Sequence, residues 1–299
     1  MDHGLYAYSA LPLRPAGGPA LRGGLSAFAV LFLEHWELQA PADALRDPRM
    51  VGEFGSFTPD YRSWSQREYG LRVGIFRVID ALQHAGIRPV IAANAMAVQR
   101  LPELVKQFRQ WGCEWIAHGQ SASRMMHARM PVEEQARHIQ DAVATLATLA
   151  GQRPIGWLSQ DWGTTPETPR LLAQAGIRFT LDWCNDDQPY WLHTAPPLLA
   201  IPLASEWDDV QCQWLRNVEP RAHAQLALQA FMRLRAECAA HARGAVFGLA
   251  LHPWLCGMPS RIAALRGLLR ELRAPGDVHW TTPHAIHASI TGDPPDETP

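Results

Sequence analysis

The chain has 299 residues, of which 47% are hydrophobic and 19% charged, with a formal net charge of -2 at pH 7. This length can bury the core of one α/β barrel of about 250 residues or of two smaller domains. The slightly negative charge supplies no basic field for nucleic acid or an anionic membrane, so we expect a neutral small molecule or another protein as the partner.

Cysteine usage and the N-terminal sequence bear on the cellular compartment. The five cysteines are scattered, odd in number and contain no CxxC pair, which argues against a disulfide framework and against a structural zinc site. Residues 1–19 lack the basic region and apolar core of a secretory signal. Because no apolar run reaches the length of about 18 residues that indicates a membrane span, we expect a cytoplasmic protein.

The chain begins with an irregular lead-in over residues 1–24, which hold three prolines and several glycines. Residues 25–36 are apolar until Glu34, a pattern typical of a strand buried on both faces. A polar and aromatic loop is expected over residues 37–68, and loops of that length are commonly functional or disordered.

From residue 69 onward, amphipathic helices that end near glycine alternate with short apolar strands. The expected helices are 69–85, 101–111, 131–150, 168–175, 222–242 and 260–272, with glycines at 86, 112, 151, 176 and 244. The expected strands are 89–95, 113–117, 155–158, 177–181, 198–203, 245–251 and 278–280. The alternation predicts one domain over residues 25–290, built as a closed or nearly closed barrel, and a disordered tail over 291–299.

Polar and reactive side chains gather where the expected strands end. They are Glu34, His35, Asn94, His118, 159–162, 182–187, 206–209, His252 and Trp254. Because active sites of α/β barrels lie at the carboxyl ends of the strands, the convergence favours a ligand site. The richest stretch is 182–190, although an Asp/Asn-rich turn that caps itself is an alternative interpretation.

Two further groups of polar residues have less specific interpretations. Asp208 and Asp209 are interpreted as a solvated turn. Arg72 is either an inward ion-pair partner of the site carboxylates or a residue at the start of a helix.

Several of these stretches also carry a family resemblance. In order, they are Glu34 after its strand, Tyr69-Gly70 with Arg72-Val73-Gly74, His118-Gly119, Gly156-Trp157-Leu158-Ser159, 182–190 and Leu251-His252-Pro253-Trp254. From about residue 20 to residue 290 the chain resembles the polysaccharide deacetylase superfamily, and within it the branch of cofactor-free allantoinases and cyclic-imide hydrolases. The resemblance implies an α/β fold with a distorted (β/α)7 TIM-like barrel, hydrolysis of an amide C–N bond, and a homodimer or homotetramer.

The metal-binding motifs of the deacetylases are incomplete in this chain. Their first motif has two aspartates and their second reads His-x-x-x-His, whereas here Glu34 is the single carboxylate of the first and Ala122 replaces the second histidine. A catalytic zinc needs about three protein ligands. We therefore expect no cofactor; if a divalent metal such as zinc is bound, Glu34 and His118 are the expected ligands, with Asp182 or His127 as a conceivable third.

The resemblance and the residue chemistry together suggest roles. We expect Glu34 to be the general base, with a pKa raised by its apolar strand, His252 to protonate the leaving nitrogen, and His118 to stabilise the oxyanion. The expected substrate-binding residues are Asn94, Trp157, Ser159, Asp182, Trp183, Asn185, Asp186, Asp187 and Trp254.

The resulting hypothesis is the ring-opening hydrolysis of a small cyclic amide, imide or ureide. A ring carbonyl of this kind is already electrophilic, which suits a site without a metal. Two alternatives stay open: a metal-dependent carbohydrate N-acetyl deacetylase with an atypical metal site, and a non-catalytic member that binds a ligand.

Overall fold

The computed structural model describes residues 3–14, 21, 24–42, 44–45 and 59–292. Its strands are β1 (Leu25–Leu33), β2 (Val90–Ala93), β3 (Trp115–Ala117), β4 (Gly156–Trp157), β5 (Phe179–Thr180), β6 (Tyr190–Leu192), β7 (Leu198–Ala200), β8 (Ala245–Leu251) and β9 (His279–Trp280). They form one sheet in the order β6-β7-β5-β4-β3-β2-β1-β8, with β9 beside the start of β1. Every pair is parallel except β6 with β7.

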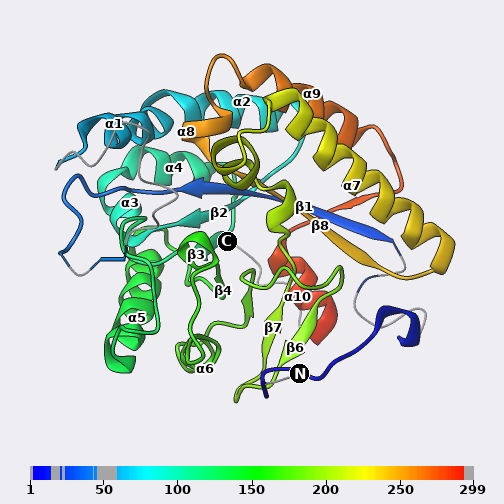
Figure 1. Cartoon of the computed structure of the whole chain (residues 1–299), viewed down its shortest axis with the longest axis horizontal. Coiled ribbons are helices and arrows are strands. Elements are labelled where there is room, and N and C mark those ends of the chain that lie inside the picture. Colours follow the sequence, from blue (N-terminus) through cyan, green and yellow to red (C-terminus); the bar gives the residue numbers. More distant parts are fainter. Residues whose placement is uncertain (1–2, 15–20, 22–23, 43, 46–58, 293–299) are drawn as a thin grey trace.

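The helices lie around this curled sheet, with α2, α7 and α9 along one side (Figure 1). They are α1 (Tyr61–Tyr69), α2 (Ile75–His84), α3 (Ala95–Arg100), α4 (Pro102–Gln110), α5 (Val132–Leu149), α6 (Thr168–Gln174), α7 (Pro220–His241), α8 (Pro253–Cys256), α9 (Ile262–Arg273) and α10 (Pro283–Thr291). A π-helical turn over Gly70–Gly74 joins α1 to α2. None of the described helices is long and apolar enough to cross a membrane.

Strand β1 is buried along its whole length because its two faces meet two different apolar layers. Ala27, Leu31 and Leu33 pack with the outer helices. Phe28 and Phe32 alternate with them and point into the barrel interior. Ile286 of α10 belongs to the same interior cluster, so the last helix helps to fill the barrel.

The sheet curls into a distorted barrel, as the sequence predicted, but it does not close by strand pairing between β8 and the β6–β7 hairpin. The gap is bridged by the loop before β6 instead. The backbone N–H of Val246 donates to the carbonyl of Asp187 at 2.9 Å, and the Gln188 amide donates to the carbonyl of Gly244 at 2.7 Å.

Most expected helices and strands are present within a few residues, and the differences have local causes. The predicted loop 37–68 is wrong at its end, where Asp60 caps α1 by accepting a hydrogen bond from the Ser63 N–H at 3.0 Å. Much of that loop, 43 and 46–58, lies outside the described residues. Helix α7 ends with Ala242, not Gly244, in the left-handed conformation, at φ 49°.

Helices α3, α8 and α10 and strand β6 were not predicted, since each is short or begins directly after another element. Helix α10 ends at Thr291, next to the start of the expected tail. The remainder of the tail and part of the N-terminal lead-in lie outside the described residues.

Candidate active site

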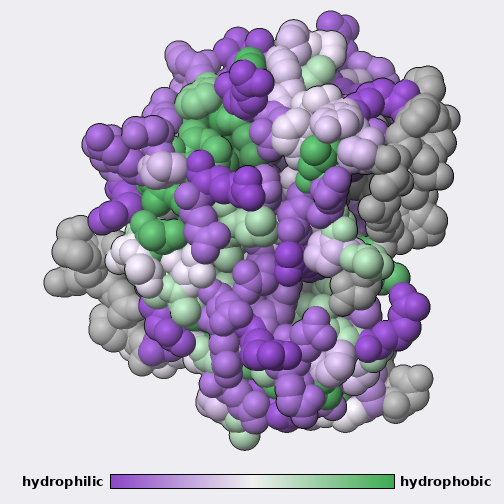
Figure 2. All heavy atoms as spheres, turned by 90° about the vertical axis from the view of Figure 1, so that its left-hand side faces the viewer, coloured by the Kyte–Doolittle hydropathy of each residue, from purple (hydrophilic) through white to green (hydrophobic). Residues whose placement is uncertain are grey.

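A cavity of about 540 Å³ opens at the carboxyl ends of the strands. These ends lie on the left in Figure 1, the side that faces the viewer in Figure 2, where hydrophobic residues are surrounded by hydrophilic ones. The polar and aromatic side chains that line the cavity include Glu34, Trp36, Arg67, Ser159, Gln160, Asp208, His252 and Trp254. Ala122 also lines it, and its small side chain leaves space where the deacetylase motif has a histidine.

Glu34 follows β1 directly and is only 5% exposed. Its Oε1 accepts a hydrogen bond from the Gln160 amide at 2.9 Å and lies 3.3 Å from Nε2 of His118. Burial alone would raise the pKa of Glu34, but His118, the positive charge of His252 and the Gln160 amide outweigh it and lower the pKa to about 2. The prediction of a raised pKa is therefore wrong, and Glu34 is a carboxylate at neutral pH.

His118 follows β3 and orients Glu34. Its Nδ1 lies 2.6 Å from the carbonyl of Leu158, which can only accept, so Nδ1 carries a proton. Nε2 then faces Glu34. Since both ring nitrogens have partners and His118 is not among the described residues that line the cavity, the structure places it behind Glu34 and not where an oxyanion would form.

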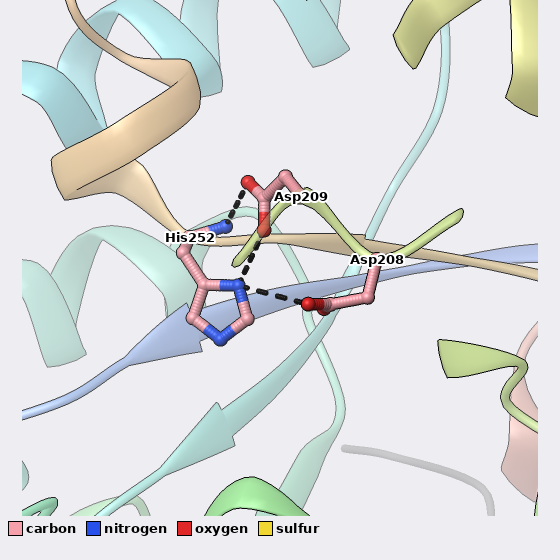
Figure 3. A group of neighbouring side chains, drawn as sticks. All are labelled: Asp208, Asp209 and His252. Carbon is pink, nitrogen blue, oxygen red and sulfur yellow. Dashed lines mark hydrogen bonds and ion pairs between the residues drawn. The ribbon is translucent and has the colours of Figure 1, made fainter. Parts of the chain in front are cut away.

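His252 follows β8 and is held by Asp209 through two hydrogen bonds (Figure 3). Nδ1 lies 2.6 Å from Oδ1 of Asp209, and the His252 backbone N–H donates to Oδ2 at 2.8 Å. The ring stacks on Phe32 with a centroid distance of 3.9 Å. Burial lowers the pKa of His252, but Asp209, Asp208 and Glu34 raise it to about 10. His252 is therefore an imidazolium whose Nε2–H lies on the side of the ring away from the aspartates.

Asp208 and Asp209 are both completely buried, so their interpretation as a solvated turn is wrong. Asp208 accepts a hydrogen bond from the Gln211 N–H at 2.8 Å, while its Oδ2 has no hydrogen-bond partner and lies 3.8 Å from Nδ1 of His252. Burial is the main cause that raises the pKa of Asp208 to about 7. Its side chain can therefore accept or donate a proton at the cavity wall near neutral pH.

Asp208, Asp209 and His252 could also hold a metal ion, because their ligand atoms lie within 4.8 Å of one another. One imidazole nitrogen and two carboxylates suit a divalent cation. The ion would replace the proton on Nδ1 of His252, which Asp209 now binds. Glu34 and His118, the ligands expected from the sequence, do not belong to a group of three possible ligands among the described residues.

Four of the predicted substrate-binding residues stabilise the barrel rim. Asp182 accepts hydrogen bonds from the Ser159 N–H at 2.6 Å and hydroxyl at 2.9 Å, and burial raises its pKa to about 6. The fully buried Trp157 donates to the Ser159 hydroxyl. Asn94 bridges the loops after β1 and β3, accepting from the His35 N–H and donating to the His118 carbonyl. Of these four, Ser159 also lines the cavity.

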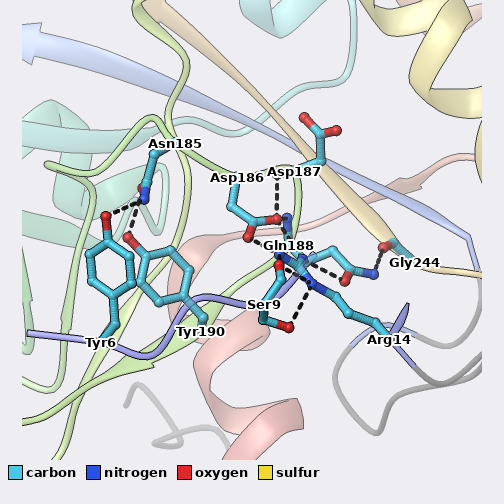
Figure 4. A network of polar contacts seen from close by, with 9 residues as sticks. All are labelled: Tyr6, Ser9, Arg14, Asn185, Asp186, Asp187, Gln188, Tyr190 and Gly244. Carbon is cyan, nitrogen blue, oxygen red and sulfur yellow. Dashed lines mark hydrogen bonds and ion pairs between the residues drawn. The ribbon is translucent and has the colours of Figure 1, made fainter. Parts of the chain in front are cut away.

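The rest of the loop 182–190 does not belong to the cavity wall, contrary to the prediction. Asp186 pairs with both terminal nitrogens of Arg14, at 2.7 and 2.6 Å, and Asn185 bonds to the hydroxyls of Tyr6 and Tyr190 (Figure 4). Trp183 packs edge-on against Tyr6. Asp187 joins the start of β8 through its carbonyl. The polar side chains thus fasten the N-terminal segment to the barrel.

Arg67 and Trp36 line the cavity and were not predicted, whereas Trp254 was. Gly70 and Gly74, at the two ends of the π-helical turn, let the helical segment that carries Arg67 lie close to Trp254. A Cβ atom on Gly70 would lie 2.5 Å from the backbone nitrogen of Trp254, so only glycine lets α8 approach the π-helical turn this closely. Arg72 is exposed, so it is not an inward ion-pair partner, and it lies within the π-helical turn Gly70–Gly74 and not at the start of a helix.

Known proteins share this fold. A crystal structure of PuuE allantoinase is 25% identical with a TM-score of 0.79, covering 95% of this chain and 96% of that one. A Pseudomonas aeruginosa PAO1 structure, provisionally assigned as a polysaccharide deacetylase, is 24% identical with a TM-score of 0.79, covering 95% and 100%. The chain therefore has the fold of the polysaccharide deacetylase superfamily.

Similarity in sequence covers less of the chain than similarity in structure. No family model matches the chain. A Schizosaccharomyces pombe protein, provisionally assigned as a polysaccharide deacetylase, is 28% identical over 147 residues, which are 46% of this chain and 44% of that protein. The match therefore spans less than half the length of this curated relative.

Proposed function

We propose that the chain hydrolyses a C–N bond, other than a peptide bond, in a small cyclic amide, imide or ureide. The observation that carries the proposal is the pairing, in one cavity, of an ionised carboxylate with an imidazolium, Glu34 and His252. The similarity to an allantoinase structure of the same superfamily supports it.

The two groups supply the two proton transfers that the reaction needs. Glu34 takes a proton from a water molecule as the water oxygen bonds to the ring carbonyl carbon. His252 then gives its Nε2 proton to the ring nitrogen as the C–N bond breaks. The opened product carries a carboxylic acid at one end and an N–H group at the other. Each transfer contributes about 10²–10⁴-fold to the rate.

The charges of the pair are coupled. The positive charge of His252 helps to lower the pKa of Glu34 to about 2, which makes Glu34 a weak base at the start. When His252 releases its proton, that lowering influence disappears, and Glu34 holds the proton it has taken more strongly. A proton returning from Glu34 to His252 through solvent restores the starting state.

The first test is turnover of allantoin, hydantoin, succinimide and dihydrouracil by the purified protein. We expect ring opening, and a loss of about 10²–10⁴-fold in the Glu34→Gln variant, because its amide cannot accept the proton. Glu167→Gln, which changes an exposed carboxylate paired with Arg170, is the matched control. Turnover by Glu34→Gln at the wild-type rate would contradict the assignment. If the wild type opens none of these rings, a ligand-binding protein is favoured.

A second candidate is a metal-dependent carbohydrate N-acetyl deacetylase, which is favoured by the group of Asp208, Asp209 and His252. Zinc bound there would polarise the acetyl carbonyl. Acetate release from an N-acetylglucosamine oligomer that disappears with chelator and returns with zinc would support this candidate. Ring opening that survives the chelator supports the metal-free reaction.

We also propose that the protein acts in the cytoplasm as a homodimer or homotetramer, without nucleic acid or membrane as partner. All five cysteines are free in the structure, which is compatible with a reducing compartment. Val73 and Phe76 are exposed apolar residues that a second copy would cover. Light scattering after gel filtration measures the oligomeric state, and a monomer at micromolar concentration would contradict the proposal.

A further inference from the structure

Arg67 is an unusual component of the cavity wall. It comes from α1, is 6% exposed, and its guanidinium lies over two indoles, with Cζ 4.0 Å from the centroid of the Trp36 ring and 4.9 Å from that of Trp254. One terminal nitrogen donates to the Ser63 carbonyl at 3.3 Å, and Nε has no partner. Within the described part of the chain, no carboxylate forms an ion pair with it.

A buried guanidinium without an adjacent counter-charge is costly, because it has lost its water and gained little in return. Burial lowers the pKa of Arg67 to about 10, with Glu34 and Asp60 acting in the opposite direction, so the group remains a cation at neutral pH. The two indole faces hold the cation by cation–π interactions and fix its orientation. They supply no acceptor for its N–H groups.

Other residues of the cavity wall also have polar atoms without partners. The unpartnered donors are Nε of Arg67 and the indole Nε1 of Trp36, Trp162 and Trp254. The unpartnered acceptors are Oε1 of Gln160 and Oδ2 of Asp208. Donors therefore outnumber acceptors, and one of them is charged. The carboxylates of Glu34, Glu37, Asp60, Asp161 and Asp208 line the same cavity, so the match to an acceptor-rich, negatively charged group is confined to the surroundings of Arg67.

We propose that Arg67, held against the rings of Trp36 and Trp254, binds a carboxylate on the non-reacting part of the substrate. The planar guanidinium can present two parallel N–H groups to a carboxylate, which supplies both the missing acceptors and the missing charge. The inference rests on the proposed function for the reacting part of the ligand. It narrows the substrate class to cyclic amides that carry a carboxylate.

Dihydroorotate and dihydrouracil form a matched pair of probes, since they share one ring and differ by a carboxylate. We expect the wild type to have the higher kcat/KM for dihydroorotate. In Arg67→Met, which keeps the apolar stem, the ratio of the two kcat/KM values should fall by about 10- to 100-fold. Arg67→Lys keeps the positive charge but lacks the two parallel N–H groups of the guanidinium, so its ratio should lie between those of the wild type and Arg67→Met. Arg72→Met, the same change at an exposed arginine, should leave the ratio unchanged.

A wild-type ratio near one, or a ratio that survives Arg67→Met, would overturn the carboxylate subsite. If neither ring is opened, the hydrolysis proposal fails separately, and calorimetric binding of the same two compounds decides the subsite. Wild-type protein should then bind dihydroorotate at least about tenfold more tightly than dihydrouracil. Equal affinity, or no binding of either, would reject the inference. Should Arg67→Met not fold, the comparison of the wild type with Arg67→Lys decides.

Discussion

Both carboxylate oxygens of Asp209 form hydrogen bonds with one residue, His252, and this keeps the proposed acid protonated. We predict that Asp209→Asn moves the alkaline limb of the pH–rate profile toward neutral pH, because the negative charge that raises the pKa of His252 is lost. At about pH 9 the variant should lose ~10-fold or more in kcat/KM relative to the wild type. The titration of His252 followed by NMR measures the same shift without turnover.

The same residue pair predicts how stability depends on pH. The pKa of His252 is raised from 6.5 to about 10, so its contribution to the free energy of unfolding is full below pH 6.5 and is lost as the pH rises toward 10. Asp277→Asn removes an exposed carboxylate paired with Arg235 and is the control. If Asp209→Asn unfolds with the same alkaline dependence as the wild type, Asp209 does not hold the proton on His252.

The residues of the cavity were only partly predictable from the sequence. Glu34 and His252 stand directly after long apolar strands, so their place at the strand ends follows from the pattern alone. Asp209 sits in a short polar stretch that has the same appearance as a surface turn. Arg67 lies in a polar helix, and its burial depends on the distant Trp254, which no local pattern reveals.

At the scale of elements, the contact between α8 and the π-helical turn Gly70–Gly74 positions Trp254 beside the cavity. We predict that Gly74→Ala lowers the free energy of unfolding by ~1–3 kcal/mol, because the new Cβ atom would lie 2.3 Å from the carbonyl of Pro253 and push α8 away. Chemical denaturation measures the change. The affinity of the cavity for its ring ligand, for example dihydroorotate, should also fall as Trp254 moves.

Gly267 of α9 offers a matched control for that substitution. A Cβ atom there meets nothing within 4 Å, and alanine is a better helix former than glycine, so Gly267→Ala should be more stable by about 0.5–1 kcal/mol. Equal effects of the two substitutions would show that the contact between α8 and the turn is not tight.

At the scale of the whole molecule, the loop 182–190 and the N-terminal segment complete the barrel where strand pairing does not. We predict that Arg14→Met lowers the free energy of unfolding by ~1–3 kcal/mol, because it leaves the partly buried Asp186 without its two charged hydrogen bonds. Turnover should be unchanged, since Arg14 lies outside the cavity wall. Differential scanning calorimetry and the ring-opening assay test the two halves of the prediction.

The exposed pair of Arg170 and Glu167 supplies the comparison for that substitution. Arg170→Met should change the free energy of unfolding by less than about 0.5 kcal/mol, because solvent screens the pair. A loss at Arg14 no larger than at Arg170 would mean that the N-terminal segment does not brace the barrel.

The overall alternation of helices and strands was predictable, because the glycines at 86, 112, 151 and 176 all end helices with a positive φ. The closure of the barrel was not. The stretch 182–190 has the composition of a ligand loop, yet its acids and amides are used by Arg14, Gly244 and Tyr6. The composition of a loop shows which donors and acceptors it has, but the fold determines which residues they bond to.

The register of the central strand has a consequence for how the protein is made. Strand β1 pairs with β8 over seven residues, from Leu25 with Ala245 to Leu31 with Leu251. One edge of β1 therefore stays open until β8, which is far away in the sequence, has been translated. Because contacts so distant in sequence slow folding and expose strand edges meanwhile, nascent chains that end before β8 are the forms most prone to aggregate.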